Sequence, residues 1–152
     1  MTMYDGVDIQ FRNPDNWRQS KEGTVITIAP DGGVVSGSLA WGMTISPYDA
    51  DTHGAPRVSL DDATDQLLGV LQRNNPAMRV TRDRQPVRVA GFQGYVTEAS
   101  NDSPAGGVET DWIVTVSASN GRLYYFVGVA PQNDFFEYHR SFQDVIDSVR
   151  FK

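Results

Sequence analysis

The chain has 152 residues, no cysteine and a net charge of −6 from 19 acidic and 13 basic side chains. This length suits a single domain over residues 1–152, and the lack of cysteine excludes disulfides, thiolate metal sites and cysteine nucleophiles. The negative charge argues against nucleic acid as a partner, and no apolar run approaches the ~20 residues that span a bilayer, so we expect no direct membrane insertion.

The first third of the chain is predicted to form strands. Apolar and polar residues alternate over 7–12, residues 24–29 form a β-branched run, and alternate positions are apolar over 39–46. A turn cluster occupies residues 13–16, and we expect Trp17 to anchor the corner after it. The N-terminus lacks the basic and apolar segments of a signal peptide and enters a strand pattern almost at once. We therefore expect a domain taken from a longer protein.

The first helix is predicted over residues 60–74, after a polar loop at 47–56. Ser59 can accept a hydrogen bond from the amide of Asp62, and acidic residues favour the positive end of a helix. Apolar residues then recur at helical spacing. We expect the helix to end at Asn74-Asn75-Pro76, because asparagine tolerates a left-handed conformation and proline cannot continue the helix.

The second half is predicted to contain four strands and a closing helix. The strands are expected at 78–89, with a break at Pro86, and at 95–99, 111–119 and 122–130; the helix follows at 134–149. Residues 91–94 indicate a turn, and Asn120-Gly121 indicates a type I′ turn in the last hairpin. Strands joined by short turns pair antiparallel, and two amphipathic helices need a sheet to cover. These patterns predict an α+β fold: an α/β/α sandwich with a twisted antiparallel sheet of about seven strands and two main helices.

One metal-site hypothesis concerns the polar loop. Asp49, Asp51 and His53 occupy alternate positions, followed by Gly54, in the rhythm of an EF-hand calcium loop. The twelfth position is Leu60 instead of a bidentate glutamate, and a strand precedes the loop. Calcium or small-ligand binding and an ordinary Asp/Gly turn therefore remain two interpretations of this segment.

The chain has one basic cluster. Arg82, Arg84 and Arg88 share strand parity and are predicted to line one face, where they would contact an anion or an acidic protein. The alternative is a solvated strand face balanced by nearby acids.

Catalytic and cofactor motifs are missing from the sequence. His53 and His139 are its two histidines, so no HExxH zinc motif exists, and neither GxSxG nor a phosphate-binding glycine loop is present. His139 lies beside the apolar stripe of the closing helix, which indicates a packing role. The aromatic residues are interpreted as core, with a ligand pocket as the alternative. We expect no cofactor and no enzymatic activity in this domain.

Two resemblances add to these expectations. The closing helix, with Phe142, Val145/Ile146, Ser148, Val149 and Phe151, resembles the end of the PsbP-like α/β/α fold. The strand opening with Trp17, segments 27–35 and 60–80 and the Thr110-Asp111-Trp112 strand are similar to a C-terminal domain of bacterial HtpX-like zinc metallopeptidases. In that family the zinc site belongs to a separate upstream domain, so no catalytic residue transfers to this chain.

The resemblance implies an accessory domain that docks a protein partner or the parent protease domain, exported or associated with a bacterial cell envelope. The alternative is a small-ligand or calcium-binding module that uses the 47–56 loop. The sequence leaves the oligomeric state open.

Overall fold

The computed structural model describes residues 1–118 and 121–152. The strands in this part of the chain are β1 (Thr2–Asp5), β2 (Ile9–Asn13), β3 (Trp17–Glu22), β4 (Val25–Pro30), β5 (Val34–Val35), β6 (Ser38–Leu39), β7 (Gly42–Tyr48), β8 (Arg79–Val89), β9 (Phe92–Asp102), β10 (Val108–Ser117), β11 (Leu123–Pro131) and β12 (Arg150–Phe151). The helices are α1 (Leu60–Asn74) and α2 (Phe135–Ser148).

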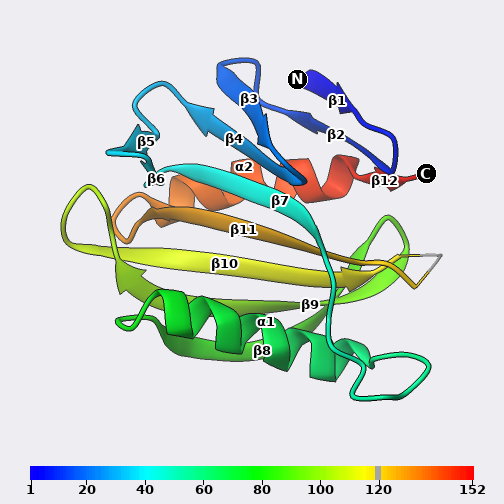
Figure 1. Ribbon diagram of the computed structural model, residues 1–152. Coiled ribbons are helices and arrows are strands. Elements are labelled where there is room, and N and C mark those ends of the chain that lie inside the picture. The colour runs from blue at the N-terminus through cyan, green and yellow to red at the C-terminus, as the bar shows by residue number, and fades with distance from the viewer. Residues whose placement is uncertain (119–120) are drawn as a thin grey trace.

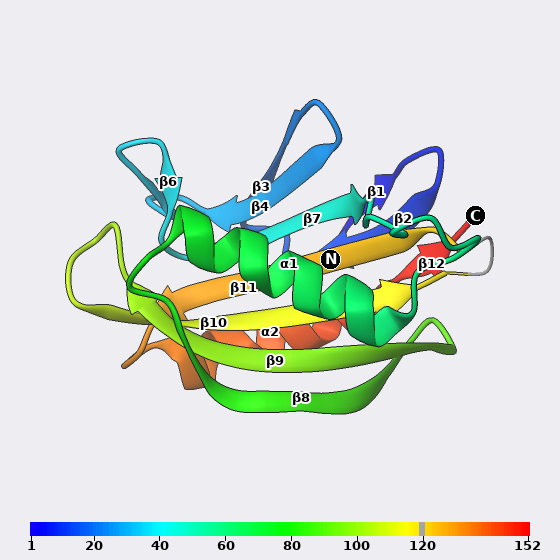
Figure 2. The ribbon, with the colours of Figure 1, turned by 60° about the horizontal axis from the view of Figure 1, so that its bottom comes forward.

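A seven-stranded antiparallel sheet forms the middle layer, in the order β3-β4-β7-β11-β10-β9-β8. Helix α1 crosses one face of the sheet and helix α2 lies on the other (Figures 1 and 2). This arrangement confirms the predicted α/β/α sandwich and its two helices. Neither helix within the described residues is long and apolar enough to cross a membrane.

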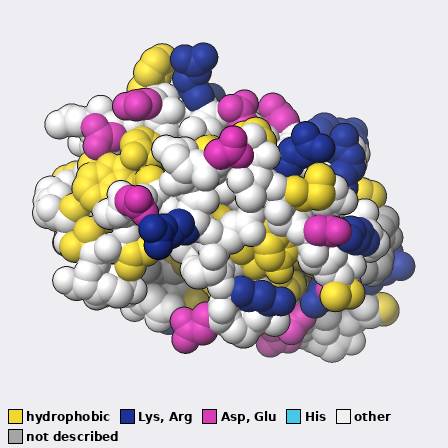
Figure 3. Space-filling model, turned by 90° about the horizontal axis from the view of Figure 1, so that it is seen from above, with side chains coloured by type: hydrophobic (Ala, Val, Ile, Leu, Met, Phe, Trp, Pro, Cys, Tyr) yellow, Lys and Arg dark blue, Asp and Glu magenta, His cyan; other side chains and the backbone are white. Residues whose placement is uncertain are grey.

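The sequence reading of the N-terminal strands was wrong in two respects. The strand at 9–13 does not join the large sheet but pairs with β1 and β12 in a separate three-stranded sheet. The seventh strand of the large sheet is β3, which begins at Trp17, where a corner was expected. Residues 18–22 are exposed, so this edge strand shows no apolar alternation. Figure 3 looks onto this side and shows charged side chains of both signs scattered over it.

Aromatic packing dominates the α2 face of the sheet. Phe142, fully buried, lies with its ring centroid 6.2 Å from that of Trp112 and 6.1 Å from that of Trp17. The ring of His139 packs against Trp112 at 5.3 Å and Phe135 at 5.4 Å, which confirms its packing role. Helix α2 therefore packs on the sheet through ring contacts along one stripe.

A smaller cluster holds α1. Leu67 packs with Met78, Ala99 and Ile113, and the hydroxyls of Thr64 and Thr115 lie 2.7 Å apart within hydrogen-bonding distance. The predicted Ser59 cap is present, because its hydroxyl accepts from the Asp62 amide at 3.1 Å.

Two predicted turns differ from those in the structure, and a third includes residues outside the described ones. Asn75, the residue after α1, has φ −136° and ψ 81°, so it is not left-handed; its side-chain amide donates instead to the Leu71 carbonyl at 2.9 Å. The turn expected at 91–94 occurs at Ala90-Gly91, both with positive φ, and β9 starts at Phe92. The predicted turn at Asn120-Gly121 and the end of the strand at Ser119 include residues outside the described ones.

The first and last strands of the chain flank β2 in the small sheet. Strand β12 pairs with β2, and the Lys152 amide donates to the Asp8 carbonyl at 2.9 Å. The Lys152 side chain also forms an ion pair with Asp5. Both ends consequently lie on the same side of the molecule (Figure 1).

Gly128 makes room for the largest fully buried side chain of α2, Phe142. This glycine pairs with Trp112 on one side and Met43 on the other, in the middle of the sheet. A Cβ atom at this position would lie 2.6 Å from the Phe142 ring, well inside van der Waals contact. The close approach of α2 to β11 thus depends on glycine here.

We expect Gly128→Ala to lower the free energy of unfolding by about 1–3 kcal/mol, because the ring must shift in a filled core. Gly69→Ala in α1 is the matched control. Its Cβ would meet only the end of the Arg73 side chain at 3.4 Å, and alanine favours a helix by about 1 kcal/mol over glycine. Urea denaturation of both variants measures the difference; equal stabilities would contradict this account.

Candidate acid pocket

Two acidic side chains are buried near the start of β10. Glu109 and Asp111 are two residues apart and therefore point to the same face of the strand, the face that α1 covers. Their exposed fractions are 4% and 5%. Glu109 is opposite Asn101 of β9, and Asp111 is opposite Val129 of β11.

The burial follows from the position of β10 in the sheet. Trp112, Val114 and Val116 face α2, so the odd-numbered residues must face α1. Ile113 and Thr115 are covered by the helix, through Leu67 and Thr64 respectively. Closer to the start of the strand the helix ends, and the two acids are left facing a pocket.

The pocket, which we call the acid pocket, has a volume of about 290 Å³. Its walls come from the end of α1, the β5–β6 hairpin, the β9–β10 loop and strands β10 and β11, and these segments meet at the left of Figure 1. Its apolar wall is formed by Leu39, Leu71, Met78, Pro104, Val127 and Val129, and its polar wall by Ser38, Asn75, Asn101, Asp102, Glu109 and Asp111. Acidic groups, amides and a hydroxyl therefore line the same hollow as a set of apolar side chains.

Burial changes the protonation of both acids. Loss of hydration, the hydrogen bond with Asp111 and the charges of Asp111 and Asp102 raise the pKa of Glu109 to about 10. Burial also raises the pKa of Asp111, although hydrogen bonds from the side chains of Glu109 and Asn101 act in the opposite direction. At neutral pH Glu109 is therefore protonated, and its proton is shared with Asp111.

One oxygen of the pair lacks a partner. Asp111 Oδ1 is inaccessible and accepts no hydrogen bond from the described residues. Buried polar atoms are nearly always paired, and one left unpaired costs about 1–3 kcal/mol. The acid pocket thus contains an acceptor that a donor from outside the chain can satisfy.

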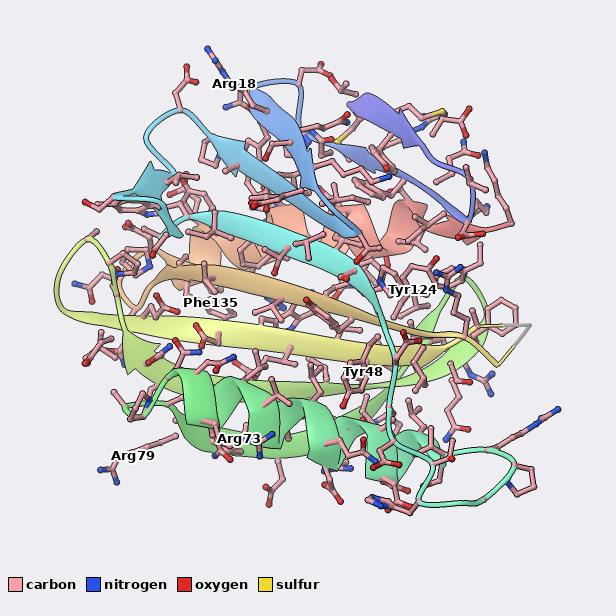
Figure 4. The ribbon with its side chains drawn as sticks, viewed as in Figure 1. Arg18, Tyr48, Arg73, Arg79, Tyr124 and Phe135 are labelled. Atoms are coloured by element: carbon pink, nitrogen blue, oxygen red, sulfur yellow. The ribbon has the colours of Figure 1, made fainter. Side chains whose placement is uncertain are left out.

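Among the described residues, none of those that line the acid pocket is basic. Of the arginines labelled in Figure 4, Arg73 lies on α1 and Arg79 extends away from the fold at the start of β8. Among the described residues, no group of three or more histidine, cysteine or acidic side chains is arranged to hold a metal ion. The residues of the acid pocket can therefore accept hydrogen bonds and supply a negative charge.

The predicted calcium residues lie in the loop after β7. The Asp51 carboxylate accepts from the His53 amide at 2.8 Å, and the His53 ring nitrogen lies 3.6 Å from it. Asp49 instead borders a shallow depression of about 490 Å³ with Thr52 and Arg57. Asp51 and His53 come together and Asp49 stands apart, and calcium binding at this loop stays a prediction.

The predicted arginine cluster is divided among different partners. Arg84 is tied to Asp61 and Asp65 of α1, Arg82 lies 3.6 Å from Glu98, and Arg88 donates to the Gly91 carbonyl at 3.0 Å. Register shifts in β8 between Val80 and Gln85 interrupt the simple alternation on which their common face was based. A contact role for Arg82, Arg84 and Arg88 stays a prediction.

Sequence reasoning missed Glu109 and Asp111. Two acids at matching parity beside an apolar, central-strand pattern were the available signal, but the strand was expected to start only at Asp111. The structure begins β10 at Val108 and so places both acids inside the sheet.

No family model matches the chain, and no curated protein is similar to it in sequence. Solved structures do share its fold. The cyanobacterial PsbP protein (CyanoP) of Synechocystis sp. PCC 6803 has a TM-score of 0.69 at 10% identity, covering 99% of this chain and 92% of that one. LpqN of Mycobacterium tuberculosis, described as involved in cell envelope biogenesis, has 0.62 at 17%, covering 99% and 90%.

A third structure, PA94 of Pseudomonas aeruginosa, described as a protein of unknown function and putative regulator, has a TM-score of 0.58 at 16% identity, covering 97% and 94%. Identities this low establish the fold alone. The chain has a PsbP-like fold, and the expected link to HtpX-like metallopeptidases stays a prediction.

The raised pKa of Glu109 makes stability depend on pH. Between its ordinary pKa of 4.5 and about 10, the folded chain keeps a proton that the unfolded chain loses, so stability falls as pH rises. Glu109→Gln keeps the shape without the proton equilibrium. We expect it to be more stable than the unchanged protein at pH 7 by about 1–3 kcal/mol and similar near pH 4.

Denaturant unfolding across this pH range measures the effect. Glu22→Gln, at the exposed end of β3, is the control and should leave the pH profile as it is. Parallel profiles for Glu109→Gln and the unchanged protein would contradict the buried-acid account.

Proposed function

We propose that this chain is a non-catalytic interaction domain and that the acid pocket is its binding site. The observation that carries the proposal is the unpartnered, inaccessible oxygen of Asp111 in a pocket with one polar and one apolar wall. Pockets of mainly apolar lining with a few convergent polar groups are typical of ligand sites. A ligand that donates a hydrogen bond to this oxygen would make an interaction that the unliganded domain lacks.

The lining supports binding over catalysis. A carboxyl with a raised pKa can act as a general acid, but a reaction also needs a nucleophile or a base positioned against the substrate. The pocket residues supply carboxyls, amides and the Ser38 hydroxyl around an apolar wall, with no histidine, cysteine or lysine among them. These groups hold and orient a guest.

The wider role belongs to the same proposal. The domain would serve as an accessory unit C-terminal to a bacterial zinc metallopeptidase, exported or at the cell envelope, and dock the parent protease domain or a protein partner. The sequence resemblance supports it, as does the fold shared with LpqN, whose description places it in cell envelope biogenesis. Arg82 and Arg88, on the exposed edge strand β8, are the proposed protein contacts.

The second candidate is a small-ligand or calcium module at the 47–56 loop. The depression beside Asp49, Thr52 and Arg57 favours it, because it gathers an acid, a hydroxyl and a cation. It is the weaker candidate, since none of these residues is buried and water already hydrates their polar groups.

A fragment screen by ¹H–¹⁵N NMR tests the binding site. We expect small polar fragments to shift the amides of 101–103, 109–111 and 127–129 together. Leu39→Trp should remove these shifts, because Leu39 forms the hairpin side of the pocket.

Val34→Trp is the matched control, since Val34 pairs with Leu39 in the same hairpin but is exposed and does not line the pocket. The proposed site would be wrong if fragments shifted amides outside the pocket instead, or if the pocket amides still shifted in Leu39→Trp.

The accessory role has its own test. We expect the full-length gene to encode an upstream HExxH domain, and that domain to co-purify with this one when the two are expressed as separate chains. Arg82→Glu combined with Arg88→Glu should weaken the association. A gene without such a domain would remove the metallopeptidase context and leave the pocket proposal standing.

A further inference from the structure

We infer that the acid pocket takes a protonated primary amine on an unbranched alkyl chain, the chemistry of a lysine side chain or a free alkylamine. This inference rests on the proposed function and names the class of its ligand. It follows from the charge of the site, the number of free acceptor atoms and the nature of the walls.

The charge of the site calls for a cation. Asp102, Glu109 and Asp111 line the pocket and no lysine or arginine does. A neutral guest would satisfy the unpartnered Asp111 oxygen but would leave the carboxylate charge uncompensated in a site with little water. A cation satisfies both requirements.

The cation should carry a single charge. Glu109, with its pKa raised to about 10, keeps its proton at neutral pH, so the buried pair carries at most one negative charge. A divalent metal would have to displace that proton and find further oxygen ligands. No set of three or more acidic or histidine side chains within the described residues is arranged for this.

The number of free acceptor atoms separates an ammonium from a guanidinium. A guanidinium binds a carboxylate best through both oxygens at once. Asp111 offers Oδ1 alone, because the hydrogen bonds with Glu109 and Asn101 occupy the carboxylate elsewhere. A compact ammonium, which needs a single strong acceptor and turns freely to use its other donors, suits this geometry better.

The walls suit an alkyl chain. Leu39, Leu71, Met78 and Val127 line the pocket together with the acids, and they come from β6, α1, the segment before β8 and β11 respectively. The methylene groups of a lysine side chain commonly lie along apolar surface while the charged end reaches a polar group. A pocket lined by apolar side chains and carboxyls offers both kinds of contact.

Titration of the ¹⁵N-labelled domain with model compounds tests the inference. The probes are Nα-acetyl-lysine amide and n-hexylamine, with Nα-acetyl-norleucine amide as the uncharged control and Nα-acetyl-arginine amide as the guanidinium control. We expect both amines to shift the pocket amides and to bind at least tenfold tighter than the norleucine and arginine compounds. Tighter binding of the lysine compound than of hexylamine would indicate a protein ligand, and the reverse order a free amine.

Two nearly isosteric variants sharpen the test. Asp111→Asn removes the charge and should weaken amine binding at least tenfold. Glu22→Gln, at the exposed end of β3 and outside the pocket lining, is the control and should retain binding within about threefold. The amide spectra of both variants report whether they are folded.

The inference is overturned if the norleucine compound binds as well as the amines, if Asp111→Asn binds unchanged, or if calcium or magnesium ions shift the same amides more strongly. These outcomes leave the binding site itself intact when other fragments still enter the pocket. Failure of fragments of every charge class to enter would instead remove the proposed function.

Discussion

The burial of β10 on both faces is the constraint on which the rest of this structure depends. One face meets α2 through an aromatic layer that is closed by Phe142 over Gly128. The other face meets α1, whose 15 residues extend ~22 Å, whereas the 10 residues of β10 extend ~33 Å. A helix of this length leaves one end of the strand without a cover, and the sheet there must be closed by other means.

Loops and two acids occupy that uncovered end. The β5–β6 hairpin and the β9–β10 loop approach from either side, and they enclose Glu109 and Asp111 without filling the space above them. Removing water from two neighbouring carboxyls is costly, and the chain lowers the cost by retaining a proton on Glu109. Asp111 still has an oxygen that accepts no hydrogen bond from the described residues. An energetically unfavourable arrangement thus persists at a place where the layers leave a hollow, which is the pattern expected of a functional site.

The architecture was predictable from the sequence because periodicity reports burial. The stripes of both helices and the alternation of β10 and β11 identified the layers, and the cap at Ser59 identified where α1 begins. The strand that opens with Trp17, β3, was indicated by the family resemblance alone, because an exposed edge strand needs no apolar residues and its pattern carries no signal. The parity of the β8 arginines was misleading for another reason: register shifts are set by pairing with β9 and leave little trace in composition.

The sequence did not predict the acid pocket because its lining residues are far apart along the chain. Its lining comes from positions as far apart as Ser38 and Val129, and only the sheet order brings them together. Charged residues in a sequence ordinarily indicate a solvated surface, so an acid pair suggests exposure until the strand that carries it is known to be central. Burial, unlike periodicity, depends on which elements end up as neighbours.

The placement of both terminal strands in the small sheet has a practical consequence. Strands β1 and β12 lie at the upper right of Figure 1, whereas the segments that line the acid pocket gather at its left. A tether, a tag or a fused domain attached at either end would therefore lie across the domain from the pocket lining. The domain can be immobilised on a sensor surface through either end while the pocket residues stay free to meet a ligand.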